Sequence, residues 1–142
     1  MDAATKTPAL AATAQTMLRV VIGFLFAAHG WQKYFQYTLD GTTAAFGQMG
    51  VPAAGLVAPV VATLEIAGGI ALVLGVLTRV FAVLLTVNML GALVLVHAPA
   101  GVFVEAGGFE LVLALAAGAA AIALLGPGRF SVDRFIPARI AA

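Results

Sequence analysis

The sequence predicts an all-α fold, an antiparallel bundle of four transmembrane helices with both termini in the cytoplasm. Composition is the first sign of this class. Of the 142 residues, 63% are hydrophobic and only 9% are charged, whereas a soluble domain carries about 25% charged residues. The mean hydropathy is +1.10. The apolar residues are also gathered into runs close to the length of about 20 residues that crosses a bilayer core of about 30 Å.

Four apolar runs predict the helices. They extend from about Thr16 to Tyr37, Ala54 to Leu77, Thr78 to Ala98 and Gly107 to Leu125. Together they define a transmembrane domain at residues 16–128. We expect the Ala/Thr-rich segment at residues 1–15 to be a disordered or frayed tail. Residues 129–142 form a basic tail, which we expect to be cytoplasmic.

The connections follow from turn-forming residues and from spacing. The second and third runs almost touch, so residues 75–79 must form a tight turn between antiparallel helices. A polar loop at 38–52 has room for one short helix around Thr42–Met49. A Pro/Gly turn follows at 98–101, and the Gly-Pro-Gly sequence at 126–128 ends the last helix. The first run lacks a clear cleavage site, so we treat it as a retained helix rather than a signal peptide.

The basic residues predict the orientation. Of the seven Lys and Arg residues, only Lys33 lies toward one side of a four-helix bundle. The other six lie on the opposite side: Lys6, Arg19, Arg79, Arg129, Arg134 and Arg139. Cytoplasmic loops carry the excess of Lys and Arg. The sequence therefore predicts a multi-pass protein of the bacterial inner membrane.

Composition also excludes several chemistries. The chain has no cysteine, which removes disulfides, thiol catalysis and a protein-ligated iron–sulfur cluster. With a net charge of +1 and no basic run, nucleic acid is not an expected partner. His29 and His97 differ in depth by roughly 10 Å, so they are not expected to be paired haem ligands. No metal site is predicted, because the His and Glu residues have no ligand spacing.

Glu65 is the most informative residue, since it lies in the middle of an otherwise uncharged apolar run. An ionisable group at that depth is costly and is usually functional. Lys33 has a matching depth, roughly 21 Å from the basic anchor of its helix, so an ion pair between the two is expected. His29 shares a helix face with Lys33. With Asn88, these groups predict a polar pocket that opens outward.

Each of these residues also has a structural interpretation that stays open. Lys33 could extend to the outer interface beside aromatic residues, and Asn88 and His29 could serve only to join helices. His97 could be solvated at a helix end. Glu110 could cap the first turn of the last helix, where the helix dipole favours an acid.

The order of the motifs resembles the DoxX family over residues of about 17–135. The similarity is carried by Arg19, His29 to Lys33, Gly50-Val51-Pro52, Glu65 to Gly69, Thr78-Arg79, His97, Gly108 to Glu110 and Gly126 to Asp133. The resemblance implies a small four-helix protein of the bacterial inner membrane. The family takes its name from a membrane subunit of an archaeal quinone-reducing enzyme, and relatives are linked to membrane oxidoreductase complexes. The polar set that it implies is Arg19, His29, Lys33, Glu65, His97 and Glu110.

We therefore expect the membrane subunit of a redox system that binds a quinone or a similar small molecule. Glu65, Lys33 and His29 are the predicted catalytic groups, with Glu65 relaying a proton and the two bases donating hydrogen bonds. Residues predicted to contact the ligand are Trp31, Asn88, His97 and Glu110, with Phe24, Phe26 and Phe35 as further aromatic lining. A non-catalytic anchor for a partner oxidoreductase and a small proton-coupled transporter are the alternatives. The expected partners are the lipid bilayer, a soluble redox protein and further copies of the chain.

Overall fold

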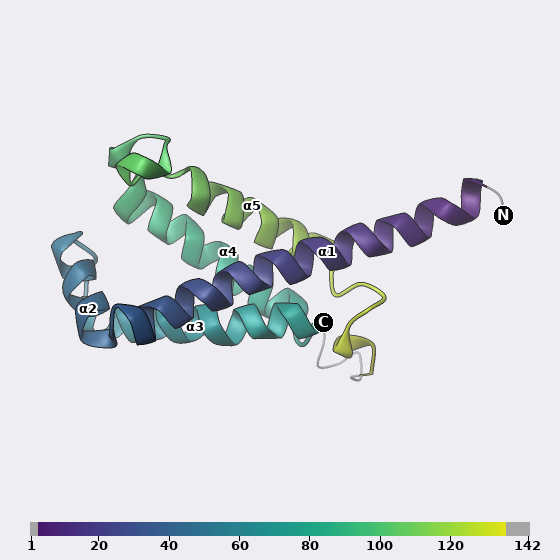
Figure 1. Ribbon diagram of the computed structural model, residues 1–142, viewed down its shortest axis with the longest axis horizontal. Coiled ribbons are helices and arrows are strands. Elements are labelled where there is room, and N and C mark those ends of the chain that lie inside the picture. Colours follow the sequence, from purple (N-terminus) through teal and green to yellow (C-terminus); the bar gives the residue numbers. More distant parts are fainter. Residues whose placement is uncertain (1–2, 136–142) are drawn as a thin grey trace.

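The computed structural model describes residues 3–135, and every regular element in that range is a helix. Five α-helices make up the bundle (Figure 1): α1 (Ala3–Trp31), α2 (Leu39–Gln48), α3 (Ala54–Leu74), α4 (Thr78–Ala92) and α5 (Glu110–Leu125). Two π-helical turns, η1 (Gln32–Gln36) and η2 (Leu93–His97), continue α1 and α4. Three short 3-10 turns complete the described part: η3 (Ala98–Ala100), η4 (Val104–Ala106) and η5 (Val132–Phe135).

Three helical segments are long and apolar enough to cross a membrane: Pro8–Gln36, Ala54–Leu74 and Thr78–Ala100. The last apolar helix, α5, has 16 residues and is therefore about 24 Å long. The four-span count and the orientation of the termini stay predictions. The short helix expected in the 38–52 loop is confirmed by α2. α1 begins at Ala3, so it covers most of residues 1–15. The fraying that the sequence predicts for these residues also stays a prediction.

Helices α1 and α3 pack closely through glycines. A Cβ added at Gly23 would lie 2.7 Å from the Gly69 carbonyl oxygen, and one at Gly30 would lie 2.6 Å from the Ile66 nitrogen. From the other side, a Cβ at Gly69 would collide with the backbone of Ala27. Small residues let helix backbones approach closely in membrane bundles, so the glycines hold α1 and α3 together as one rigid pair.

Helices α4 and α5 form the second pair. Their buried residues include Leu85, Met89, Leu115 and Ala119, which belong to one apolar core with Phe26 of α1. Figure 1 shows α4 leaving its turn beside α3 and diverging from α3 along its length. The two pairs are therefore close at one end of the bundle and apart at the other. We call the first the turn end (residues 75–77) and the second the loop end (residues 98–109).

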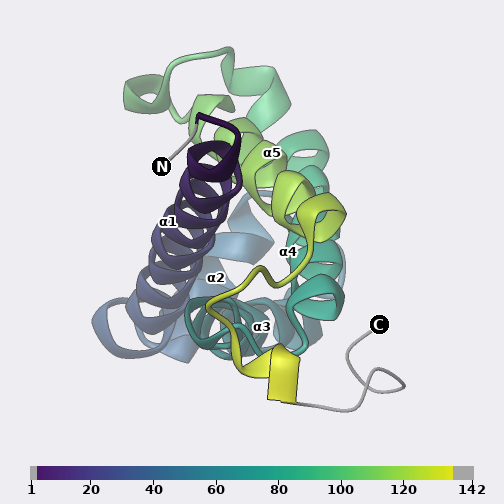
Figure 2. The same cartoon turned by 90° about the vertical axis from the view of Figure 1, so that its right-hand side faces the viewer.

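A buried polar cluster holds the turn end together. Arg19 is 1% exposed, and its guanidinium donates hydrogen bonds to the carbonyl oxygens of Leu72, Val73 and Phe130. The segment after α5 crosses this end of the bundle (Figure 2) and brings in Asp133. Its carboxylate accepts hydrogen bonds from the Leu77 and Thr78 amides, at the N-cap and first residue of α4, at 2.6 and 2.9 Å. These bonds fix the α3–α4 turn, where Leu77 adopts a left-handed conformation with φ 45°.

Candidate functional site

An ion pair lies in the middle of the bundle. The Lys33 Nζ is 2.5 Å from Oε2 of Glu65, and Asn88 of α4 donates from Nδ2 to Oε1 of the same carboxylate at 3.2 Å. Glu65 is 2% exposed and the Lys33 side chain 18%. The predicted pair is thus confirmed. Both carboxylate oxygens are engaged, which offsets the cost of keeping a charge in an apolar interior.

The π-helical turn η1 sets the position of Lys33. A π turn changes the register of a helix, and such turns are frequent at functional sites. The Lys33 carbonyl accepts a hydrogen bond from Oγ1 of Thr42 at 2.8 Å, and the Tyr34 hydroxyl lies 2.6 Å from Oγ1 of Thr63. The first contact ties the turn to α2 and the second ties it to α3. The Lys33 backbone is therefore held from two sides.

A cavity of about 400 Å³ opens above the ion pair, within the range of about 300–1,000 Å³ that is usual for small-molecule sites. Its lining is mainly apolar and comes from all five α-helices and the loop end. The polar groups in it are His29, Lys33, Glu65, Asn88 and His97. Aromatic and sulfur side chains contribute from α1, α2, the C-cap of α2 and α4: Phe26, Phe46, Met49 and Met89.

The cavity offers more hydrogen-bond donors than acceptors. The Lys33 ammonium carries three N–H groups, and Glu65 takes one of them. Asn88 keeps its carbonyl oxygen and one N–H, while the His29 ring makes no hydrogen bond to another described residue and lines the cavity. The formal charges of Lys33 and Glu65 cancel. A neutral ligand with an apolar body and carbonyl or hydroxyl oxygens matches these groups.

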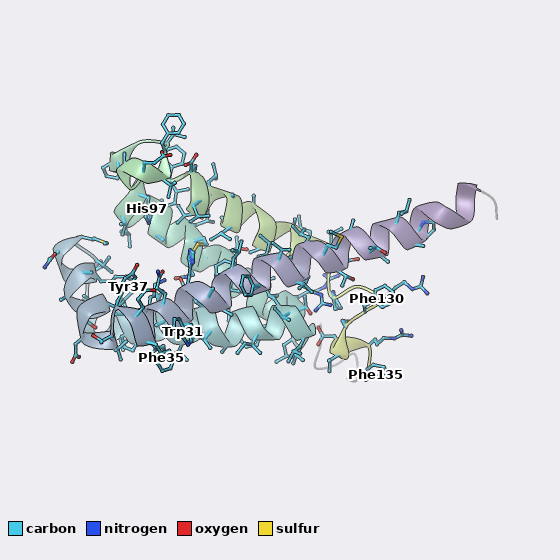
Figure 3. All side chains as sticks on the ribbon, in the orientation of Figure 1. Trp31, Phe35, Tyr37, His97, Phe130 and Phe135 are labelled. Carbon is cyan, nitrogen blue, oxygen red and sulfur yellow. The ribbon has the colours of Figure 1, made fainter. Side chains whose placement is uncertain are left out.

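The cavity does not include every residue that the sequence predicts for the site. Trp31 is 56% exposed and stacks on Phe35 at a ring separation of 5.5 Å. Figure 3 shows Trp31, Phe35 and Tyr37 gathered near one end of α1. The physical reason is helical spacing: Phe26, His29 and Lys33 share one face of the helix. Phe24 and Trp31 lie on another face, and both are exposed.

His97 and Glu110 form hydrogen bonds within the loop end and do not contact the ion pair. The His97 Nδ1 lies 2.8 Å from the Gly107 carbonyl oxygen, and Oε1 of Glu110 accepts from the Val104 nitrogen at 2.8 Å. His97 still lines the cavity, whereas Glu110 does not. Both residues therefore hold the 98–109 loop in place over the cavity.

Sequence reasoning missed three contributors: Thr42, Asp133 and Phe46. Thr42 is buried and positions Lys33 from α2, and its signal was only a small hydroxyl residue in a polar loop. Asp133 belongs to the motif Gly126 to Asp133. Its role in capping α4 depends on the segment after α5 folding back across the turn end. Phe46 replaces the aromatic lining expected from Phe24, Trp31 and Phe35.

These features define a small helical membrane protein with a buried acid–base pair at the floor of an intramembrane cavity. Comparison with known proteins gives the family. The family model described as DoxX matches residues 14–98, and the chain belongs to the DoxX family. The resemblance found in the sequence is thus confirmed.

Several relatives match most of the chain. An uncharacterized membrane protein of Mycobacterium tuberculosis is 35% identical over 135 residues, covering 88% of this chain and 82% of that protein. The protein named "Putative oxidoreductase CatD" of Bacillus subtilis is 32% identical over 120 residues, covering 84% of each chain. The inner membrane protein YqjF of Escherichia coli is 34% identical over 118 residues, covering 83% of this chain and 88% of that protein. No solved structure matches.

Proposed function

We propose that the chain is the membrane subunit of a redox system and binds a quinone or a similar ring compound in the cavity above Lys33 and Glu65. The observation that carries the proposal is the pairing of mainly apolar walls with hydrogen-bond donors at one floor. A quinone needs both, since its ring and tail are apolar and its carbonyl oxygens accept hydrogen bonds. A relative named as an oxidoreductase supports the redox assignment.

The proposed roles follow from the hydrogen-bond donors and acceptors that each side chain has left unused. Lys33 and His29 donate to a ring carbonyl, and Phe26 and Phe46 pack against the ring. Lys33 donates a hydrogen bond to Glu65 at 2.5 Å, and a proton that its ammonium gives to the ligand can be replaced through the contact with Glu65. A quinone bound here would accept electrons and protons. The electrons must come from a partner or a second bound molecule, since the chain has no cysteine to hold a cluster.

The setting of the site completes the proposal. A relative named as an inner membrane protein supports a bacterial inner membrane location. The excess of basic residues near the turn end supports a cytoplasmic turn end and cytoplasmic termini. In this orientation the cavity lies in the periplasmic half of a four-span bundle. A soluble redox partner and self-association remain parts of the proposal that binding measurements can address.

The test is a quinone titration of the purified protein in detergent. Ubiquinone and menaquinone analogues without tails are titrated against the wild type, His29→Leu and Glu65→Gln, with binding followed by quenching of the sole tryptophan and by calorimetry. We expect saturable binding to the wild type. His29→Leu should weaken it about tenfold through loss of one hydrogen bond to the ligand, and Glu65→Gln should weaken it through a misplaced Lys33.

The matched control is Glu105→Gln, which removes an exposed acid that does not line the cavity. It should bind quinone like the wild type. Equal binding by all four proteins would place the ligand elsewhere and overturn the proposal. An absence of saturable binding to the wild type would also overturn it and favour the anchor alternative.

A further inference from the structure

Gly91 is a glycine of a long helix that lines the cavity and has no packing neighbour at its Cβ position. A Cβ added at this position would meet no heavy atom within 4 Å, although the residue is inside α4 and lines the cavity. Glycine destabilises a helix interior relative to alanine. Gly23, Gly30 and Gly69 are explained by close helix packing, but no packing contact explains Gly91. Empty space beside it is the feature that needs a reason.

That space lies between two rows of side chains. On the α4 side, Val87, Gly91 and Leu95 are spaced by four residues, so they lie along one face. On the α3 side, Val57 and Val61 have the same spacing. All five line the cavity. We call the part of the cavity lining that these five residues form the slot.

The slot lies within the membrane-crossing segments. Both of its sides belong to the segments Ala54–Leu74 and Thr78–Ala100. Val87 and Leu95 are 62% and 53% exposed, and exposed valine and leucine at this depth contact lipid. From Val87 to Leu95 the slot follows about 12 Å of helix axis. Val87 and Leu95 therefore line the cavity and also face the hydrocarbon region.

Two further segments line the cavity at the loop end. α2 and its C-cap contribute Phe46 and Met49 to the lining, and the 98–109 loop contributes Val104, Gly107 and Gly108. The loop is held by its own backbone bonds from Phe109 to Gly101 and from Glu110 to Val102, at 3.0 and 2.9 Å.

We propose that the cavity is loaded sideways from the bilayer through the slot at Gly91, and that its ligand carries a long apolar chain that stays in the slot. This inference rests on the proposed function, since the polar head of that ligand is the ring bound beside Lys33. Gly91 is then the point where the apolar tail of the ligand passes closest to α4. The ligand class narrows from ring compounds in general to membrane-dissolved quinones with a polyprenyl tail.

The first experiment compares tail lengths. Quinones with one head group, either without a tail or with a long prenyl tail, are titrated against the wild type and Gly91→Leu in the same detergent. Taking the ratio of Kd between variant and wild type for each quinone cancels partition into the micelle. We expect Gly91→Leu to raise the Kd of the long-tailed quinone about tenfold or more and to leave the tail-less quinone nearly unchanged. The variant should fold, because an added Cβ at this position meets no heavy atom within 4 Å.

The control is Gly55→Leu, in α3, where an added Cβ also meets nothing within 4 Å and which does not line the cavity. It should alter neither Kd. The same change for both quinones in Gly91→Leu, or no change for either, would overturn the slot while leaving quinone binding intact. If the wild type binds no quinone at all, the proposed function fails first, and the second experiment decides the slot alone.

The second experiment needs no ligand. Because the natural chain has no cysteine, Gly91→Cys carries a nitroxide spin label at one defined place. In liposomes, its relaxation by molecular oxygen, which concentrates in the membrane, is compared with relaxation by a water-soluble nickel chelate. Val83→Cys, on the exposed surface of α4, provides the lipid reference. Oxygen should dominate at both positions; dominance of the nickel chelate at residue 91 would mean entry from water and would overturn the proposal.

Discussion

Removing the amine of Lys33 should destabilise the protein strongly, and removing both charges should not. In Lys33→Met, the carboxylate of Glu65 loses the partner 2.5 Å away and keeps only the neutral amide of Asn88, at 3.2 Å. Breaking one side of a buried ion pair costs about 3–5 kcal/mol. We expect the lower part of that range, because Lys33 borders the cavity and is 18% exposed.

The double variant Lys33→Met/Glu65→Leu separates pairing from packing. It replaces the buried pair by apolar side chains of similar volume, a change that is often neutral or stabilising. We therefore expect its free energy of unfolding to lie within about 2 kcal/mol of the wild type. A double-mutant cycle gives the coupling energy between the two residues.

The assay is reversible unfolding in mixed micelles, followed by far-ultraviolet circular dichroism and tryptophan fluorescence. Arg129→Met is the control, since it removes an exposed charge and should change stability by no more than about 0.5 kcal/mol. The reasoning is refuted if Lys33→Met costs no more than this control. It is also refuted if the double variant loses as much stability as the two single variants added together.

Three further changes test the parts that hold the site. Asp133→Ala removes the cap of α4 and should cost about 1–2 kcal/mol in unfolding free energy. Gly69→Ala places a methyl group against the backbone of α1 and should cost about 1–3 kcal/mol, whereas Gly47→Ala, with open space around it, should be neutral or stabilising in the same unfolding assay. Thr42→Val removes the hydrogen bond to the Lys33 carbonyl and should weaken quinone binding in titrations. Thr42→Ser keeps the hydroxyl and should bind quinone like the wild type. Equal effects of the two substitutions would contradict a positioning role for Thr42.

The sequence predicts the helices well because apolar runs of membrane length have few alternatives. It also predicts the Lys33–Glu65 pair, since depth in a membrane can be counted along a straight helix and a buried charge needs a partner. The turn at 75–77 follows from the short gap between two apolar runs. These inferences depend only on distance along one helix and on the cost of burying charge.

The remaining features depend on how separate helices meet. A count of residues assumes a regular helix, so it does not show that α1 continues into a π turn at Lys33. The aromatic residues near Lys33 were expected in the cavity because they are near in sequence. Phe46 lines it instead, because α2 folds back over the site. Neither Thr42 nor Asp133 can be recognised as a contact until the chain has brought distant segments together.

The arrangement of contacts also indicates where the cavity can change its volume. The glycines join α1 to α3 along their length, and Arg19 and Asp133 fix the turn end. Any movement of α4 and α5 relative to the first pair would therefore be largest at the loop end, where the cavity lies. Among the described residues at the cavity floor, the bond from Asn88 to Glu65 is the polar link between the two helix pairs. Since Lys33 and Glu65 both belong to the first pair, the ion pair survives such a movement, while the hydrogen bond of Asn88 is the contact that lengthens or shortens with it.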